Sequence, residues 1–142
     1  MASELKVNTL TGVSTAGSIA VTAEGNSTTT NLQGGLTKTW SVWNKNDDSI
    51  TDSLNLSGDT DNGTGDQTLS YTNNMATAKG YGVIGNGCHT SALSTAVYVQ
   101  MPKEDDEIKT SEITLYQNYA TASTASKADR YWNFAGIWGD LA

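Results

Sequence analysis

The distribution of aromatic residues determines where this 142-residue chain can form a hydrophobic core. Its four Trp, six Tyr and single Phe all lie at or after Trp40. The segment before Trp40 has only sparse aliphatic residues among Thr, Ser and Gly, too few to offset the ~1–2 kcal/mol per residue that backbone ordering costs. We therefore predict an extended N-terminal arm over residues 1–38, either a linker or a stalk shared with other copies, and one folded domain over residues 39–142.

After Trp40, short runs of alternating apolar and polar residues are separated by Gly, Asn, Asp and Ser. This alternation is typical of strands that have one buried face, as in an antiparallel β-sandwich or barrel. The composition, with 14 Gly, one Pro and 16% charged residues, also favours strands and turns over helices. The sequence thus predicts an all-β fold, an antiparallel β-sandwich. About seven strands are expected, over residues 39–44, 49–57, 66–72, 80–85, 95–101, 111–119 and 130–138.

The last expected strand is apolar on both faces. Trp132, Phe134 and Trp138 alternate with Tyr131 and Ile137, whereas a sandwich strand ordinarily has one face in water. A cover over the outer face is therefore expected, either another copy of the chain or a long loop. A sugar-stacking platform is the alternative use of the Trp residues. The aromatics predicted to lie in the core or a trimer interface are Trp40, Trp43, Trp132, Phe134 and Trp138.

Charge and motifs argue against several classes of partner. The net charge is −7, and no cluster of Lys or Arg could neutralise phosphates, so neither nucleic acid nor an anionic membrane is expected. No apolar run approaches the ~18 residues of a spanning helix, and the N-terminus does not resemble a signal peptide, which predicts a soluble protein made in the cytoplasm. Gly80, Gly82 and Gly85 have the spacing of a dinucleotide loop, but no helical pattern follows them, and we interpret them as sites of close packing.

Catalytic groups are scarce. Cys88 and His89 are the single Cys and His of the chain, and neighbouring residues on a strand point to opposite faces, which disfavours a nucleophile with its base. The acidic run at residues 102–107 fits a solvated connection better than a pair of acids held in a cleft. We predict no catalytic residue, no cofactor and no enzyme activity.

The stretch from Asp59 to Asp66 resembles a calcium-binding loop at first sight, because Asp59, Asp61 and Asp66 surround Gly63. It lacks the Gly and Glu that an EF-hand loop requires at its sixth and twelfth positions. Asn62 and Gly63 tolerate positive φ and lie between alternating runs, which indicates a hairpin turn. An irregular cation site at these carboxylates is the alternative.

Three segments carry a family resemblance: MASELKVNTLTG at the start, GGLTKTWSVWN at the junction, and LNLSGDTDNGTGDQTLSYTNNM. They resemble small fibre proteins of tailed bacteriophages, especially those that infect cyanobacteria and other marine bacteria. The resemblance implies a homotrimer whose arm binds other virion proteins and whose β knob attaches to a host-surface polysaccharide or protein. Capsid decoration or a head fibre is the alternative role. Candidate attachment residues in the arm are Leu5, Val7 and Leu10.

If every expected strand crosses the knob, the connections alternate between its two ends. Residues 44–48, 73–79 and 102–107 and the C-terminus are then expected at the end far from the arm, and residues 61–66 and the Cys88–His89 loop at the near end. Receptor contacts are predicted at the far end. The candidates are Asn44, Lys45, Asn46, Asn73, Asn74, Lys79, Lys103 and Glu104.

Overall fold

The computed structural model describes residues 5–12, 19–22, 29–45, 47–88, 97–120 and 125–142. The chain divides into two compact units between Leu36 and Thr37, where the sequence predicted a boundary after residue 38. The first unit contains an antiparallel pair, β1 (Ala20–Thr22) and β2 (Thr29–Asn31), followed by the single-turn helix α1 (Leu32–Gly35). No helix among the described residues is long and apolar enough to cross a membrane.

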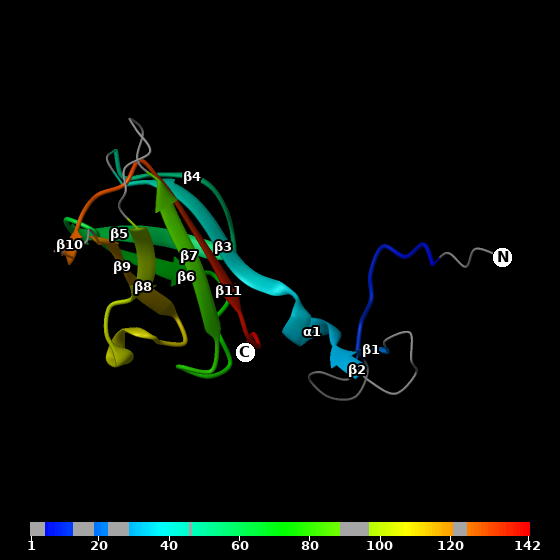
Figure 1. Cartoon of the computed structure of the whole chain (residues 1–142). Helices are drawn as coiled ribbons and strands as arrows, with labels where there is room; N and C mark the ends of the chain where they lie inside the picture. The colour runs from blue at the N-terminus through cyan, green and yellow to red at the C-terminus, as the bar shows by residue number, and fades with distance from the viewer. Residues whose placement is uncertain (1–4, 13–18, 23–28, 46, 89–96, 121–124) are drawn as a thin grey trace. The chain divides into compact units, whose positions relative to one another are not determined.

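The second unit is an antiparallel β-sandwich, which confirms the predicted fold class (Figure 1). A short 3-10 turn, η1 (Asp105–Glu107), interrupts the strands. The strands described in this unit are β3 (Thr37–Asn44), β4 (Ser49–Leu54), β5 (Leu56–Gly63), β6 (Asp66–Tyr71), β7 (Gly82–Cys88), β8 (Val97–Pro102), β9 (Glu112–Ala120), β10 (Ala125–Lys127) and β11 (Trp132–Trp138).

The strands form two sheets. The first has the order β4-β3-β11-β7, so the last strand of the chain lies between β3 and β7. In the second sheet, β9 pairs with β6 and β10 along one edge and with β8 along the other, and β5 lies outside β6. The edge strands β7 and β8 contact each other where the two sheets meet.

The expected strand at residues 49–57 was wrong in one respect, because it is two strands. Asn55 adopts a φ of 61° between β4 and β5, and this left-handed conformation ends the first strand and starts a new one. A register shift between Val42 and Trp43 also changes the face of the residues that follow Ile50 in β4. Leu54, expected on the same face as Ile50, is consequently 46% exposed, whereas Ile50 packs against the core.

The stretch from Asp61 to Asp66 forms the predicted hairpin, and its positive-φ residues are glycines. β5 and β6 pair from Leu56↔Tyr71 to Gly63↔Asp66. Gly63 has φ 113° and Gly65 has φ 61°, conformations that glycine adopts at low cost. Asn62 itself lies in β5, so the strand extends further into this turn-like stretch than the sequence indicated.

The extra strand reverses the predicted ends of the connections that follow it, whereas residues 44–48 lie far from the start of β3, as predicted. Trp138 pairs with Thr37, so the C-terminus lies at the end where β3 begins, not at the opposite end. Residues 73–79 also lie there, because Met75 forms a β-bridge with Leu141. The hairpin at residues 61–66 lies at the other end, beside residues 44–48, rather than at the near end as predicted.

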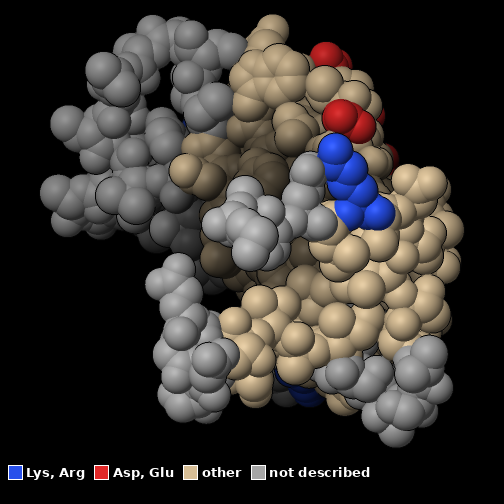
Figure 2. Space-filling view, turned by 90° about the vertical axis from the view of Figure 1, so that its right-hand side faces the viewer, with Lys and Arg blue, Asp and Glu red and all other residues tan. Residues whose placement is uncertain are grey.

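Charged side chains occupy a small part of the described surface that is visible in Figure 2. This distribution agrees with a chain of which only 16% is charged and whose polar residues are largely Thr, Ser and Asn. Because charged residues are sparse, a place where several of them lie together is a distinctive feature of the surface.

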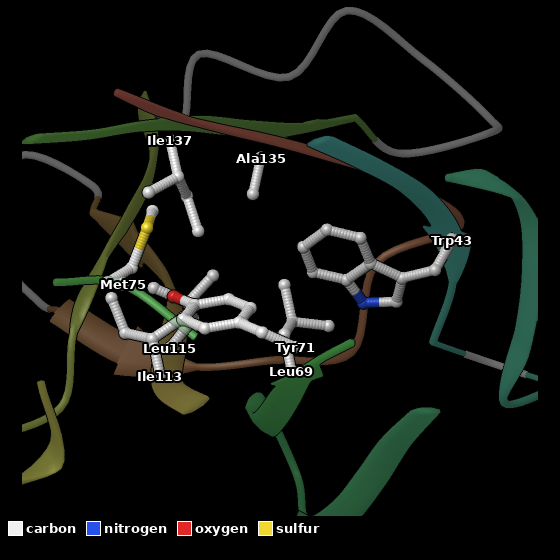
Figure 3. Packing of buried hydrophobic residues seen from close by; sticks show 8 residues of the cluster. All are labelled: Trp43, Leu69, Tyr71, Met75, Ile113, Leu115, Ala135 and Ile137. Carbon is white, nitrogen blue, oxygen red and sulfur yellow. The ribbon is translucent and has the colours of Figure 1, made fainter. Parts of the chain in front are cut away.

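The hydrophobic core lies between the two sheets. Figure 3 shows Ala135 and Ile137 pointing from β11 toward Tyr71, Ile113 and Leu115 of the opposite side. Burying such side chains stabilises the fold by about 1.5–3 kcal/mol each, which makes this cluster the main source of stability. The fully enclosed members of the cluster, each at most 5% exposed, are Trp43, Leu69, Tyr71, Met75, Ile113, Leu115, Ala135 and Ile137.

Candidate functional site

The outer face of the first sheet is apolar and exposed. Alternation along β11 directs Asn133, Ala135 and Ile137 inward, and leaves Trp132 44% and Phe134 42% exposed on the other side. The sequence predicted this two-sided strand. The structure adds that no described segment of the second unit covers its outer side completely.

Neighbouring strands extend this surface on both sides of β11. Val42 is paired with Phe134, and Trp40 and Ile84 are both paired with Gly136, so their side chains lie on the same face. Ile84 is 64% exposed, and the charged residue Asp52 is paired with Val42 on the same face, on the edge strand β4. We call this surface the apolar face. It consists of Trp40, Val42, Leu54, Ile84, Trp132, Phe134 and Trp138.

Gly136 allows the aromatic rings of the apolar face to pack. A Cβ atom added at this position would lie 2.7 Å from Cη2 of Trp138 and 3.3 Å from Cζ of Phe134. The Trp138 ring therefore lies over the glycine, in space that any other residue would fill. Beside Phe134, a hollow of about 230 Å³ is lined by Val42, Asn86, Gly87, Trp132, Asn133 and Phe134.

The predicted set of core or trimer aromatics divides between two locations. Trp43 is completely buried between the sheets. Trp40, Trp132, Phe134 and Trp138 all lie on the apolar face instead. Exposed aromatic and aliphatic side chains gathered on one face are typical of interaction surfaces, because their contact with water is unfavourable.

The outer face of the second sheet is different, because it contains a polar cavity of about 360 Å³. Part of its wall is the connection from β8 to β9, which folds back so that Lys103 N donates to Thr114 O over 2.9 Å and Ile108 forms a β-bridge with Ile113. The residues that line it are Thr60, Asn62, Asp66, Thr68, Lys103, Glu107, Lys109, Glu112 and Thr114.

Ion pairs connect the walls of the polar cavity. Asp66 lies 3.4 Å from Nζ of Lys103 and 3.7 Å from Nζ of Lys127, and its side chain is only 9% exposed. Lys109 donates to Glu112 over 2.7 Å. These contacts raise the pKa of Lys103, chiefly through Asp66, and that of Lys109, chiefly through Glu112, because each carboxylate stabilises the protonated amine.

Part of this cavity could be predicted from the alternation of residues along the strands. Thr68 and Thr114 occupy outward positions of predicted strands, so their face was inferable from the sequence. The contribution of Glu107 and Lys109 was missed, because the acidic run looked like a free surface connection. Its return over β9 depends on the docking of Ile108 against the core, a long-range contact that no local pattern encodes.

The predicted receptor residues do not form one surface. Asn44 and Lys45 lie at the end of β3, and both are mostly buried, with Lys45 3% exposed and paired with Asp48 and Asp61. Asn46 lies outside the described residues. Asn44 and Lys45 therefore lie at the predicted end, far from the start of β3, but their burial does not fit a receptor contact.

The remaining candidates lie elsewhere. Asn73 N donates to Asn55 Oδ1 over 2.7 Å, and the Asn74 carbonyl oxygen accepts from the amide of Ala142, which places both asparagines at the end where β3 begins. Lys79 forms a 3.7 Å ion pair with Asp106 on the surface. Lys103 lines the polar cavity, and Glu104 is exposed beside it.

The three candidate cation ligands have separate partners. Asp61 binds the ammonium group of Lys45, and this contact, followed by the amide of Gly63, lowers the pKa of Asp61. Burial, followed by the charge of Asp48, raises the pKa of Asp59. Asp66 belongs to the polar cavity. Within the described part of the chain, no group of three or more His, Cys, Asp or Glu side chains could hold a metal ion.

The remaining described residues that the sequence singled out belong to neither the apolar face nor the polar cavity. Gly82 and Gly85 lie inside β7, a strand rather than a turn that opens a helix. Cys88 ends that strand, and His89 lies outside the described residues. In the first unit, Leu5, Val7 and Leu10 are 79%, 55% and 55% exposed.

No protein-family model matches this chain, and neither does any curated protein or solved structure. The apolar face and the polar cavity must therefore be interpreted through their own geometry.

Proposed function

We propose that this chain is a non-enzymatic fibre or spike protein of a bacteriophage virion, which associates as a homotrimer and attaches the particle to its host. The apolar face carries the proposal. It is a broad, aromatic and largely apolar surface that the described residues of the knob leave partly in water. The resemblance of residues 1–85 to small phage fibre proteins supplies the biological setting.

The chemistry of the apolar face favours contact between identical copies. Each chain has a net charge of −7, so copies repel one another over most orientations. The apolar face carries the charge of Asp52 at its β4 edge and is otherwise built from Trp, Phe and aliphatic side chains, so copies can approach there at low cost. Trp and Phe are also enriched in the cores of protein interfaces. Closed rotational symmetry then limits the assembly to a small number of copies, which fits a trimeric fibre.

Attachment through the first unit has its own support. Leu5, Val7 and Leu10 recur in a short polar segment and are all more than half exposed. Exposed aliphatic side chains of this kind suit docking onto another protein. The proposed partner is a further virion protein.

Two other functions use parts of the same geometry. A capsid-decoration or head-fibre protein would employ the same trimer, with its arm on the capsid. A carbohydrate-binding module needs exposed Trp rings, and Trp132 meets that need. However, Val42, Leu54 and Ile84 surround the rings with aliphatic groups, which favours a protein partner over a hydroxylated one.

The trimer is tested by sedimentation equilibrium of the purified full chain at micromolar concentration. The expected mass is three times the 15.0 kDa of one chain. A species of 15.0 kDa that persists at these concentrations would contradict the proposed assembly.

The role in the virion is tested by immuno-electron microscopy of the particles that contain this chain. Label at the tail supports host attachment, and label over the head supports the decoration role. Purified protein in excess should reduce adsorption of the particles to host cells. Undiminished adsorption at saturating protein would contradict the receptor-binding role.

A further inference from the structure

We infer that the polar cavity is a saccharide-binding site that recognises neighbouring hydroxyl groups of a neutral sugar. The inference rests on the proposed attachment function and gives it a ligand class and a location. It places the receptor contact on the outer face of the second sheet rather than at an end of the knob.

A directed chain of hydrogen bonds crosses the floor of the cavity. Asn62 Nδ2 donates to Thr68 Oγ1 over 2.8 Å, and the hydroxyls of Thr68 and Thr114 are 2.8 Å apart. Thr114 Oγ1 donates to Glu107 Oε2 over 3.1 Å. Because the Thr114 proton goes to Glu107, the Thr68 proton must go to Thr114. Both hydroxyl protons are thus committed, and Oγ1 of the half-buried Thr68 offers its remaining acceptor lone pair to a ligand.

The donors of the cavity lie on its other wall. Lys103 and Lys109 each carry an ammonium group with three N–H bonds, more than their ion pairs use. A ligand therefore meets acceptors and donors within one small space. A sugar presents the complementary pattern, since each of its hydroxyls both donates and accepts.

Charge balance indicates that the ligand is neutral. Lys103 and Lys127 lie beside Asp66, and Lys109 lies beside Glu112 and within 3.6 Å of Glu107. Each of the three carboxylates of the lining thus has an ammonium neighbour, of which Lys103 and Lys109 line the cavity and Lys127 lies just outside its lining. An anionic or cationic ligand would have to break one of these pairs, whereas a neutral polyol would not.

The cavity is also held in shape before a ligand arrives. Thr114 is 3% exposed, and Asp66 is 6% exposed. The centroid of the Tyr116 ring lies 3.5 Å from Nζ of Lys127 and 5.6 Å from Nζ of Lys103, and these cation–π contacts restrain both amines. A volume near 360 Å³ falls at the lower end of the ~300–1,000 Å³ that is usual for small-molecule sites.

The position of the cavity fits the proposed assembly. It lies on the outer face of the second sheet, and the apolar face is the outer face of the first. Burial of the apolar face between copies leaves the cavity open in every copy. Three such cavities would strengthen attachment to a repeated surface glycan through avidity.

The test is saturation-transfer NMR of the purified full chain with glucose, galactose and mannose at millimolar concentration, and with galacturonate and glucosamine as charged counterparts. At least one neutral hexose should bind more tightly than both charged sugars. Glu107→Gln should weaken that binding about tenfold, as expected for loss of a hydrogen bond to a charged group. Asn62→Ala, at an exposed position that folding tolerates, should weaken it about fivefold.

Glu104→Gln is the matched control, because Glu104 lies on the same connection, is exposed and does not line the cavity. It should leave binding unchanged. Failure of all three hexoses to bind, or binding that survives both cavity variants and is lost in Trp132→Ala, would overturn the inference. If the wild-type protein still blocks adsorption in that event, the attachment function stands and only the saccharide site falls.

Discussion

The two outer faces of the sandwich are built from the same kind of strand but have opposite chemistry. On the first sheet, the outward positions of β11 and its neighbours hold mainly Trp, Phe, Ile and Val, with Asn86 beside Phe134 and Asp52 on the edge strand β4. On the second, the outward positions of β6 and β9 hold Thr, Asp and Glu, with Lys from the folded-back connection. A sandwich needs only its inner faces to fold, so both outer faces are free to serve interactions.

The chemistry of each outer face determines which kind of partner that face can accept. An uncharged aromatic surface gains free energy when water leaves it, and the gain depends little on direction. A polar cavity gains only when a ligand replaces the hydrogen bonds of water with bonds of equal quality. The apolar face therefore suits assembly, and the polar cavity suits recognition.

Replacing a Trp by Ala should cost far more stability on the inner face of the first sheet than on its outer face, and this is the largest effect that we expect. Trp43→Ala should lower the free energy of unfolding by about 3–5 kcal/mol, because Trp43 is fully enclosed. Trp132→Ala, the same change at a residue 44% exposed, should cost about 1 kcal/mol or less. Urea unfolding at low protein concentration, followed by circular dichroism, measures both. Equal costs would mean that the chain itself covers the apolar face.

The second prediction concerns the hairpin that borders the polar cavity. A Cβ atom at Gly65 would lie 2.8 Å from the Ala128 amide nitrogen and 2.8 Å from the Gln117 carbonyl oxygen, and the residue has positive φ. Gly65→Ala should therefore destabilise the fold by about 2–4 kcal/mol, through backbone strain and overpacking.

Gly63→Ala is the control for that substitution. Gly63 also has positive φ, but a Cβ atom there meets nothing within 4 Å. Its cost should stay near the ~1 kcal/mol of a left-handed residue alone. Thermal unfolding distinguishes the two variants. Equal melting temperatures would show that the backbone around Gln117 and Ala128 moves to accommodate the added methyl group at little cost.

The third prediction reverses the chemistry of the apolar face. Phe134→Lys places a charge at its centre and should raise the dissociation constant for self-association about thirtyfold, as loss of an interface hot spot does. Lys109→Glu is the matched change in the polar cavity and should leave association intact. Sedimentation velocity over a concentration series reports both. A trimer that survives Phe134→Lys would place the interface elsewhere.

Alternation of side chains made most of the fold predictable. Each of the seven expected strands corresponds to a strand in the structure, because a half-buried strand must alternate to bury one face. β5 was missed because Asp59 to Gly63 has no apolar alternation. It forms through backbone hydrogen bonds to β6 at a sheet edge, where side-chain burial is not required. That single strand was enough to reverse the predicted ends of the connections that follow it.

The candidate sites were predictable to different degrees. The apolar face follows from the local pattern in Trp132 to Trp138, since two apolar sides on one strand require two covers. The polar cavity does not, because Thr60, Glu107 and Thr114 are brought together by tertiary contacts between distant segments. Local sequence encodes the direction in which a side chain points, but not which remote segment lies beside it.

The smallest expected effect lies in the acid range, at the end of the knob where Lys45 binds Asp61. The Lys45 contact keeps the pKa of Asp61 below its ordinary value of 3.8. Its stabilising contribution is therefore present above pH ~3.8 and is lost as the pH falls through the lower, folded-state pKa. Asp61→Asn should reduce stability at neutral pH, and its deficit relative to the wild type should shrink toward pH 2.

Asp59, in the same strand as Asp61, should have the opposite effect on the pH dependence of stability. Burial raises its pKa above 3.8, so ionisation of this group opposes folding, and the wild type gains stability as the pH falls through that raised value. Asp59→Asn should be more stable than the wild type at neutral pH and lose its advantage in acid. Urea midpoints between pH 2 and pH 7 measure both differences. If the difference in urea midpoint between each variant and the wild type stayed constant with pH, neither carboxylate would have a pKa perturbed by folding.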